Sequence, residues 1–318
     1  MKIKIFVYFI LFMLCIANLI PNISANQIKS FKKLNEENPI EYWAVISGVI
    51  DYEGPYNLPV NKNPAYFMYE SLCELPNWKE SNIQLLVDAD ATMENIIGLD
   101  GKTGLGWLIE NSDDNDIVIF YFSGHGSQID DLDGDESDGK DEIIAPYDIK
   151  KEGEGFNKKI TNYISDDTLN EKLSSINCEG MCLIFDSCYC NGLLGGKNDI
   201  DKGPNRVIMT SSNKEWGLPT LVSNGDCFAK RVSDSLNGDL INEQGYLSAE
   251  EVYKNADKSW RRSVWPYFSL MFYYAYIKSL KDNLLGLIFV YIGFGGLPRP
   301  WNFPAMFDNY EGELILVE

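Results

Sequence analysis

Two short apolar runs that end in small and polar residues constrain the fold of this chain most. Ile117-Val-Ile-Phe-Tyr-Phe122 leads into Ser-Gly-His-Gly126, and Cys182-Leu-Ile-Phe185 leads into Asp-Ser-Cys188. Runs of β-branched and aromatic residues without polar alternation are typical of strands buried on both faces, as in a parallel sheet. Because open α/β sheets place ligands at the carboxyl ends of their strands, we expect functional side chains where these runs end.

Other segments alternate between strand and helix patterns. Strands are also expected over 42–48, 83–87 and 206–211, and helices over 65–75, in part over 92–110, over 166–173 and after Ser248. Asn63-Pro64 has the composition of a helix start, and Ser248 with Glu251 has the spacing of a capping box. This alternation predicts βαβ units, and therefore an α/β fold with a mostly parallel sheet.

The chain has a single histidine, His125, so any imidazole chemistry depends on it. Adjacent strand ends in a sheet lie about 5 Å apart, and their loops can bring His125 and Cys188 together. A thiol becomes a good nucleophile when an imidazole takes its proton or stabilises the thiolate. The alternative is a structural histidine in a turn and a buried structural thiol. The polar neighbours Asp186 and Ser187 argue against a purely apolar niche for the cysteine.

Composition excludes some partners and metals. With 318 residues, 45% hydrophobic content and a net charge of −20, the chain is globular and lacks the basic balance that nucleic-acid binding requires. The acidity is compatible with a cationic substrate or a bound metal, as well as with simple solubility. A zinc site is not expected, because there is one histidine and Cys178 and Cys182 lack a matching second pair.

The N-terminus has the features of a secretory signal peptide over residues 1–25. Two lysines precede an apolar stretch, and Ala25 offers a small residue at the cleavage site. We therefore expect a secreted protein, with an uncleaved membrane anchor as the alternative. Residues 26–40 are expected to be a loose segment, 41–275 the main domain, and 276–318 an extension whose packing the sequence leaves open. No disulfide is assigned, because a catalytic Cys188 must remain free.

Apolar residues over 284–296 are too few to cross a membrane as a helix, which needs about 20 residues. We interpret this run as part of a core or an interface and expect no membrane contact, although a membrane-touching segment stays an alternative. We expect the chain to be a monomer.

The two strand ends together resemble a known family. Phe122-Ser-Gly-His-Gly-Ser127 followed by Phe185-Asp-Ser-Cys-Tyr189 is similar to the caspase-like cysteine peptidases of clan CD. Within the clan, the chain most resembles metacaspases and prokaryotic caspase-like peptidases of family C14, and legumain more distantly. The acidic stretch between the motifs, 131–142, is also similar to metacaspases, and the resemblance covers roughly 41–255. It implies a three-layer sandwich with about six strands and helices on both faces.

The resemblance also implies the chemistry. The chain would be a cysteine endopeptidase that hydrolyses protein or peptide substrates and requires no cofactor for the chemistry. His125 would be the general acid/base and Cys188 the nucleophile. The backbone N–H groups of Cys188 and Gly126 are candidates for the oxyanion hole, since glycine permits close approach of a substrate.

Specificity follows from the same comparison. Metacaspases take Arg or Lys before the scissile bond, and Asp186 and Ser123 match residues that line their pocket. A carboxylate there would form a charge-assisted contact with a basic side chain. The alternative is that Asp186 only hydrogen-bonds local backbone. The aspartate often found at the first helix start in related proteins is replaced by Pro64, and Asp51 is a candidate substitute.

The acidic stretch has two interpretations. Acidic residues occupy positions 1, 3, 5 and 12 of an EF-hand-like count, but Glu136 stands where the turn requires glycine, so it is not an EF-hand. The resemblance points instead to Asp141, Asp166 and Asp167 as a site for Ca²⁺, an activator that would order the substrate-binding loops. The alternative is a solvated acidic loop.

Two competing functions remain open at this point. One is a secreted caspase-like protein without catalysis that binds calcium or another protein. The other is a legumain-like peptidase of different specificity. The presence of both His125 and Cys188 favours an enzyme. Activation by cleavage within the polar stretch 150–159 is a further hypothesis.

Overall fold

The computed structural model describes residues 38–131, 133–152, 159–212, 227–238, 245–262 and 304–317. The chain divides into two units, residues 1–40 and 41–318. The predicted signal peptide, the apolar run 284–296 and most of the predicted cleavage stretch lie outside the described residues. The architecture below is that of the second unit.

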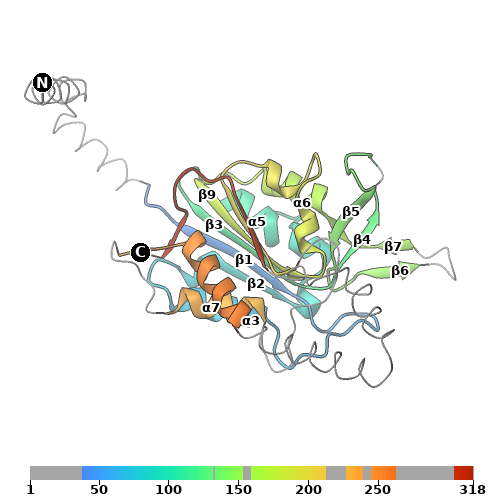
Figure 1. Cartoon of the computed structure of the whole chain (residues 1–318), viewed down its shortest axis with the longest axis horizontal. Helices are drawn as coiled ribbons and strands as arrows, with labels where there is room; N and C mark the ends of the chain where they lie inside the picture. The colour runs from blue at the N-terminus through green and yellow to red at the C-terminus, as the bar shows by residue number, and fades with distance from the viewer. Residues whose placement is uncertain are drawn as a thin grey trace, which may run out of the picture. The chain divides into compact units, whose positions relative to one another are not determined.

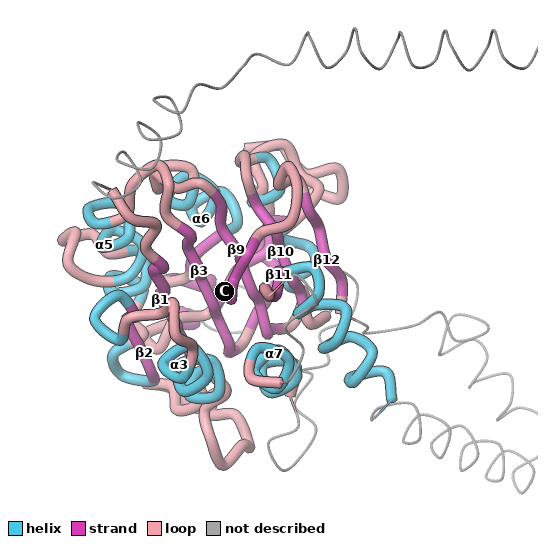
Figure 2. Tube along the Cα trace, turned by 90° about the vertical axis from the view of Figure 1, so that its left-hand side faces the viewer, coloured by secondary structure: helices cyan, strands magenta, loops and turns pink. Residues whose placement is uncertain are grey.

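A six-stranded sheet in the order β12-β10-β9-β3-β1-β2 forms the centre of this unit (Figure 2). All neighbouring pairs are parallel except β10 with β12. The strands are β1 Tyr42–Gly48, β2 Ile83–Val87, β3 Ile117–Gly124, β9 Gly180–Ser187, β10 Arg206–Thr210 and β12 Ala305–Asp308. The predicted α/β class with a mostly parallel sheet is therefore confirmed.

Helices cover both faces of the sheet, as expected for three layers (Figure 1). One face carries α3 Ala65–Glu74, α7 Phe228–Leu236 and a helical segment over 249–262; the other carries α4 Met93–Ile97, α5 Gly104–Asn111 and α6 Asp166–Leu173. The buried strands alternate between two cores. Tyr121 and Ile184 belong to the core under α3 and α7, and Phe120 and Phe185 to the core on the opposite face.

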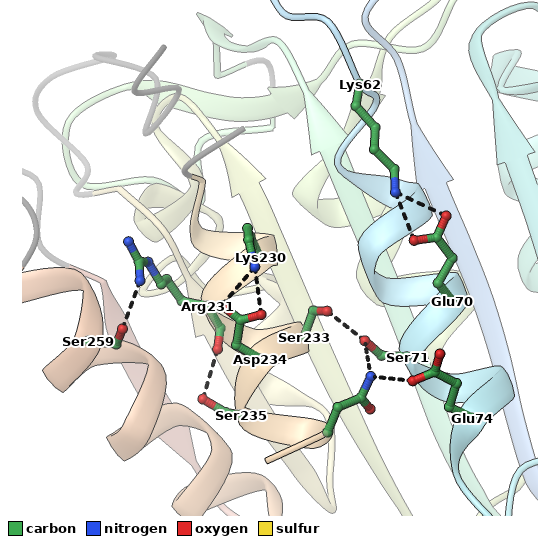
Figure 3. Close-up of polar contacts among 11 residues, drawn as sticks. Lys62, Glu70, Ser71, Glu74, Lys230, Arg231, Ser233, Asp234, Ser235 and Ser259 are labelled. Carbon is green, nitrogen blue, oxygen red and sulfur yellow. Dashed lines mark hydrogen bonds and ion pairs between the residues drawn. The ribbon is translucent and has the colours of Figure 1, made fainter. Parts of the chain in front are cut away.

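Buried hydroxyl groups join α3 to α7 (Figure 3). Ser71 Oγ and Ser233 Oγ lie 2.6 Å apart, and Asn237 Nδ2 donates to Ser71 Oγ at 3.2 Å. Arg231 on α7 donates to Ser259 Oγ at 3.0 Å, which ties α7 to the 249–262 helix. These contacts fix the two helices whose first turns lie beside the carboxyl ends of β1 and β9.

A second, three-stranded antiparallel sheet follows His125 directly. It contains β4 Gly126–Asp130, β5 Lys140–Ile144 and β8 Ile164–Ser165 in that order. The acidic residues 131–139 form the connection between β4 and β5. A small hairpin of β6 Lys150–Glu152 and β7 Lys159–Thr161 adjoins it in the chain. The sequence did not predict these strands, because they are short and mix charged with apolar residues.

The boundaries of the predicted helices agree closely with the sequence pattern, whereas α7 was not predicted. The capping box is confirmed: Ser248 Oγ accepts from Glu251 N at 3.3 Å, and Glu251 Oε2 accepts from Ser248 N at 3.4 Å. At α3 the cap residue is Pro64, and Asn63 Oδ1 accepts from Ala65 N at 3.1 Å. Short 3₁₀ turns are η1 Glu80–Asn82, η2 Asp88–Asp90, η3 Cys190–Leu193 and η4 Ile200–Lys202.

The described C-terminal residues belong to the sheets of this unit. β12 pairs with β10, and β13 Ile315–Val317 pairs with β11 Leu247–Ser248. Trp78 Nε1 donates to Leu316 O at 2.9 Å. The division at residue 275 stays a prediction. Among the described residues, no helix has the length and apolarity to span a membrane.

Candidate active site

The ends of β3 and β9 lie side by side in register. Gly124 pairs with Ser187, so His125 and Cys188 are the next residue on each of two adjacent parallel strands. Such strands are about 4.8 Å apart. The structure therefore brings together the two residues that the sequence singled out, at the carboxyl edge of the central sheet.

His125 is held by its backbone and by its ring. Its N–H donates to Tyr52 Oη at 2.7 Å, and its carbonyl accepts from Ala145 N at 2.9 Å. The ring Nε2 lies 2.8 Å from the carbonyl oxygen of Tyr56. A carbonyl oxygen only accepts hydrogen bonds, so Nε2 carries the hydrogen and Nδ1 of the neutral ring is left as the acceptor.

The loop after β1 carries Tyr52 and Tyr56, which supply two of these three contacts to His125. Asn57 Oδ1 accepts from Tyr52 N at 2.9 Å, and Asn57 Nδ2 donates to the carboxylate of Asp51. Asp88, which follows β2, accepts from Ile50 N at 2.9 Å and from Asp51 N at 3.0 Å. Asp51 is solvent-exposed and its carboxylate faces Asn57. The residue that reaches the site from this loop is therefore its neighbour Tyr52, which the sequence analysis missed.

Cys188 is half-buried, and burial is the main cause that raises the pKa of its thiol to about 11. The neighbouring Cys190 raises the pKa further, whereas hydrogen bonds from the backbone N–H groups of Gly126 and Cys188 lower it. These are the two N–H groups expected to form the oxyanion hole, and both reach the sulfur. At neutral pH the thiol is protonated and needs a base to become a nucleophile.

The turn after Cys188 is fixed to the end of β10. Tyr189 has a positive φ of 60°, which is uncommon for a residue other than glycine. Cys190 N donates to Ser212 Oγ at 3.3 Å, and Ser212 N donates to Cys190 Sγ at 3.3 Å. Ser212 Oγ also donates to Ser187 O at 2.7 Å. Cys190 is thus a structural thiol that holds this turn. None of the six cysteines among the described residues forms a disulfide bond.

Asp186 and Ser123 are paired across β9 and β3 and are both buried. They lie on the α7 side of the sheet, two residues beyond Ile184 and Tyr121. Asp186 Oδ2 accepts from Ala229 N at 3.1 Å, in the first turn of α7. The backbone partner of Asp186 is therefore remote in sequence. Pro64, at the start of α3, offers no carboxylate here.

Acidic side chains gather where the β4–β5 connection, the start of α6 and the segment before η4 meet. Three groups have carboxylate oxygens within 4.8 Å of one another: Asp131, Asp133 and Asp135; Asp135, Asp167 and Asp199; and Glu136, Asp166 and Asp199. Two of the predicted ligands, Asp166 and Asp167, belong to these groups, and Asp141 does not. The sequence analysis missed Asp199, because a loop after the cysteine motif carries it.

Burial and like charges raise the pKa values of four carboxyl groups here, those of Asp141, Asp166, Asp167 and Asp199, whereas a hydrogen bond from Gly134 N lowers the pKa of Asp131. Burial is the first cause for Asp166, with a pKa of about 9, and for Asp141, with a pKa of about 6. The pKa of Asp199 is also raised, mainly by burial. Asp141 Oδ1 is buried and has no hydrogen-bond partner among the described residues. The donor groups offer only oxygen atoms, and Asp167 Oδ1 within them is also buried without a hydrogen-bond partner among the described residues, which fits a hard cation such as Ca²⁺.

One contact path links this cluster to the turn after Cys188. Asp166 Oδ2 accepts from Glu142 N at 3.0 Å. The Glu142 carboxyl group packs against Gly192 of η3, where an added Cβ would lie 2.3 Å from it. Glu142 is buried, with 1% of its surface exposed. A shift at Asp166 would therefore move a group that touches the turn behind the cysteine.

Comparison with known proteins agrees with this geometry. Residues 44–195, just under half of the chain, match the family model described as metacaspase, peptidase C14 domain. Metacaspase-1 of Cryptococcus neoformans is 34% identical over 134 residues, which cover 40% of this chain and 27% of that protein. Metacaspase-4 of Arabidopsis thaliana is 31% identical over 135 residues, covering 42% and 29%. The chain thus spans less than a third of the length of these two relatives.

A solved structure supports the same fold. The crystal structure of protein GSU0716 from Geobacter sulfurreducens superposes with a TM-score of 0.50 at 17% identity, covering 69% of this chain and 89% of that one. The predicted resemblance is confirmed: residues 44–195 are similar to the metacaspase, peptidase C14 domain and to the matching part of these metacaspases.

Proposed function

We propose that this chain is a cysteine endopeptidase in which Cys188 is the nucleophile and His125 the general acid/base. The observation that carries the proposal is that β3 and β9 end in register, so that His125 and Cys188 follow adjacent strand ends. In addition, the Tyr56 carbonyl occupies Nε2 of the only imidazole. Nδ1 is thereby available to take a proton. A base is required, because burial keeps the Cys188 thiol protonated at neutral pH.

The reaction follows from these groups. Nδ1 of His125 takes the thiol proton, and the sulfur attacks the scissile carbonyl carbon. The resulting oxyanion accepts hydrogen bonds from the N–H groups of Gly126 and Cys188. The C–N bond breaks as the imidazolium gives its proton to the leaving amine. Water then attacks the thioester with His125 as base, the C–S bond breaks, and the free thiol is restored.

Cleavage after Arg or Lys is supported by Asp186. Its carboxylate is buried beside Ser123, on the face covered by α7, near the strand end that carries Cys188. A basic side chain would form a charge-assisted hydrogen bond with this carboxylate. Because Pro64 supplies no second carboxylate, we expect the preference for basic residues to rest mainly on Asp186.

Calcium dependence is supported by the acidic cluster. Asp199 belongs to two groups that could hold the ion, one with Asp135 and Asp167 and one with Glu136 and Asp166, and Asp141 has an unpartnered buried oxygen nearby. Ca²⁺ would supply the positive charge that lets these carboxylates ionise together. The contact of Glu142 with Gly192 offers a route from the cluster to the Cys188 turn. The predicted signal peptide would direct the chain to the secretory pathway, where calcium is plentiful.

The test compares purified wild-type protein with Cys188→Ala and His125→Ala variants. Peptides with Arg, Lys, Asn or Asp before the scissile bond are assayed with Ca²⁺ and with a chelator. We expect hydrolysis after Arg and Lys by the wild type only, and more of it with Ca²⁺. If wild type and Cys188→Ala cleave equally poorly under all conditions, the peptidase proposal fails. Cleavage after Asn alone would favour a legumain-like activity instead.

The acidic cluster also favours a second candidate, a calcium-binding protein without catalysis. Calorimetric titration of Ca²⁺ into wild type and Cys188→Ala would separate the two. Binding by both proteins, with no hydrolysis by either, would establish the second candidate.

A further inference from the structure

We infer that Tyr52 is a positioning residue that sets the place of His125 for proton transfer. The inference rests on the proposed function, because it assigns a role in the same reaction. Tyr52 does not itself contact the scissile bond in this assignment. It acts through the backbone and ring of the only histidine in the chain.

The Tyr52 hydroxyl closes a small ring of hydrogen bonds around the His125 backbone. It accepts from His125 N at 2.7 Å and donates to Ala145 O at 3.4 Å. Ala145 N in turn donates to His125 O at 2.9 Å. Both main-chain polar groups of His125 are thus fixed where β3 gives way to β4. A buried N–H that loses its acceptor lowers the stability of the folded state unless another acceptor replaces it.

The aromatic ring of Tyr52 adds a second contact. Its centroid lies 5.1 Å from the centroid of the imidazole, with an interplanar angle of 34°. The Tyr56 carbonyl from the same loop binds Nε2 at 2.8 Å. One loop therefore fixes both the backbone and the ring of His125. Within this loop, Asn57 Oδ1 accepts a hydrogen bond from Tyr52 N.

The surroundings of the hydroxyl are built for it. Tyr52 is buried, with 5% of its surface exposed. A Cβ added at Gly124 would lie 2.8 Å from Tyr52 Oη, so glycine leaves the space that the hydroxyl fills. Burial, together with the nearby Asp88 and Cys188, raises the pKa of Tyr52 well above its ordinary value. The hydroxyl therefore keeps its proton at every working pH.

This arrangement also distinguishes the N–H groups at the strand end. The His125 N–H is occupied by Tyr52, whereas the Gly126 N–H reaches the Cys188 sulfur. Loss of the Tyr52 hydroxyl would leave the His125 N–H without its acceptor and let the imidazole move relative to the thiol. A displacement of this kind lowers the rate of the chemical step more than substrate binding.

The first variant is Tyr52→Phe, which keeps the ring and removes only the hydroxyl. We expect kcat to fall at least about tenfold, with KM within about twofold, because proton transfer depends on geometry. The matched control is Tyr253→Phe, on the 249–262 helix. It removes a hydroxyl that donates to Pro304 O at 2.8 Å. This control should leave kcat unchanged.

A second measurement does not require hydrolysis. The rate at which iodoacetamide alkylates Cys188 at neutral pH is followed by mass spectrometry of the Cys188 peptide. Tyr52→Phe should slow alkylation in the wild-type background and have no effect in the His125→Ala background. Such coupling is the signature of a residue that acts through His125.

The outcomes separate this inference from the proposed function. Wild-type kcat and alkylation in Tyr52→Phe would overturn the inference while leaving the peptidase intact. Equal slowing with and without His125 would assign Tyr52 a purely structural role and also overturn it. Coupled alkylation in a protein that cleaves no peptide would support the inference and remove the proposed function. If Tyr52→Phe does not fold, Gly124→Ala displaces the same hydroxyl and must give the same coupling.

Discussion

Gly126 is packed against Cys188 so closely that a Cβ on Gly126 would lie 2.0 Å from the Cys188 carbonyl oxygen. Real atoms do not approach so closely, and the nearest atom is main chain, which cannot swing away. Any side chain at position 126 must therefore separate the two strand ends. The N–H of Gly126 would move away from the sulfur with them.

Gly126→Ala should therefore impair turnover more than binding. Loss of one oxyanion donor lowers kcat by about 10²–10³-fold, equivalent to roughly 2.7–4 kcal/mol. The measurement is kcat on a peptide with Arg before the scissile bond. Thermal unfolding shows whether the variant still folds, because separating the strand ends lowers its stability. Alkylation of Cys188 should be slower than in wild type, because the Gly126 N–H no longer lowers the pKa of the thiol. Wild-type turnover in a folded Gly126→Ala protein would remove this N–H from the oxyanion hole.

The two roles of Asp186 can be separated by isosteric substitution. Asp186→Asn keeps an oxygen acceptor for Ala229 N but removes the charge. A hydrogen bond to a charged group contributes about 1.5–3 kcal/mol, so we expect KM for Arg and Lys peptides to rise roughly 10- to 100-fold. Steady-state kinetics on matched Arg and Gln peptides measure this change.

Asp186→Ala is the companion variant, because it also leaves the Ala229 N–H without its acceptor. We expect it to lower the free energy of unfolding by about 1–3 kcal/mol more than Asp186→Asn does. An unchanged KM in Asp186→Asn, together with this stability loss in Asp186→Ala, would mean that the carboxylate serves only α7.

The sequence predicted the five parallel strands of the central sheet and the nearness of His125 to Cys188 because both depend on strong local patterns, whereas β12 at the edge of the sheet was not predicted. Unbroken apolar runs mark buried parallel strands, and β3 and β9 have the same length of eight residues, so they end together as well as start together. Gly124 and Ser187, the last residues of these two strands, therefore pair with each other. The short β4–β5–β8 sheet escaped prediction because Lys140, Asp141 and Glu142 break the apolar alternation of its middle strand.

Loop contributions to the site could not be predicted for a different reason. Tyr56 acts through its carbonyl oxygen, which every residue has, so the residue type carries no signal. Asp51 was a reasonable candidate by charge, but the loop turns its carboxylate toward Asn57 and its neighbour Tyr52 toward His125. Asp199 reaches the acidic cluster only because the segment before η4 folds back on α6.

Without a cation, we expect stability to fall as the pH rises. In the unfolded chain these carboxyl groups titrate near 3.8, whereas in the folded protein Asp141 does so at about 6 and Asp166 at about 9. Between these values the folded state holds protons that the unfolded state has released, so the free energy of unfolding decreases with increasing pH. Thermal unfolding in chelator from pH 5 to pH 9 measures this decrease.

Calcium should remove this dependence and release protons on binding. The stabilisation by Ca²⁺ should grow with pH, and calorimetry in buffers of different ionisation enthalpy should detect the released protons. Asp166→Asn is the matched variant, and its pH dependence in chelator should be weaker than that of the wild type. If the free energy of unfolding in chelator rose from pH 5 to pH 9, this account of the cluster would be contradicted.

Arg206 gives a last prediction, because it is a fully buried cation that forms no ion pair among the described residues. Its Nη1 donates to Asn170 Oδ1 at 2.7 Å and to Ile200 O, and its Nη2 donates to Ser174 Oγ at 2.9 Å. These bonds fasten η4 to α6. Burial lowers the pKa of Arg206 to about 10, so the guanidinium is charged at neutral pH.

Arg206→Lys should therefore be costly despite its conserved charge, because an ammonium group cannot reproduce the planar fork of the guanidinium. We expect the free energy of unfolding to fall by about 2–4 kcal/mol, since buried partners lose their donors. Because Asp199 directly precedes η4 and Asp166 begins α6, the gain in melting temperature on adding Ca²⁺ should shrink as well. The control is Arg261→Lys, whose exposed ion pair with Asp257 should contribute at most about 1 kcal/mol. A wild-type calcium shift in a destabilised Arg206→Lys protein would show that Arg206 supports the fold without arranging the acidic cluster.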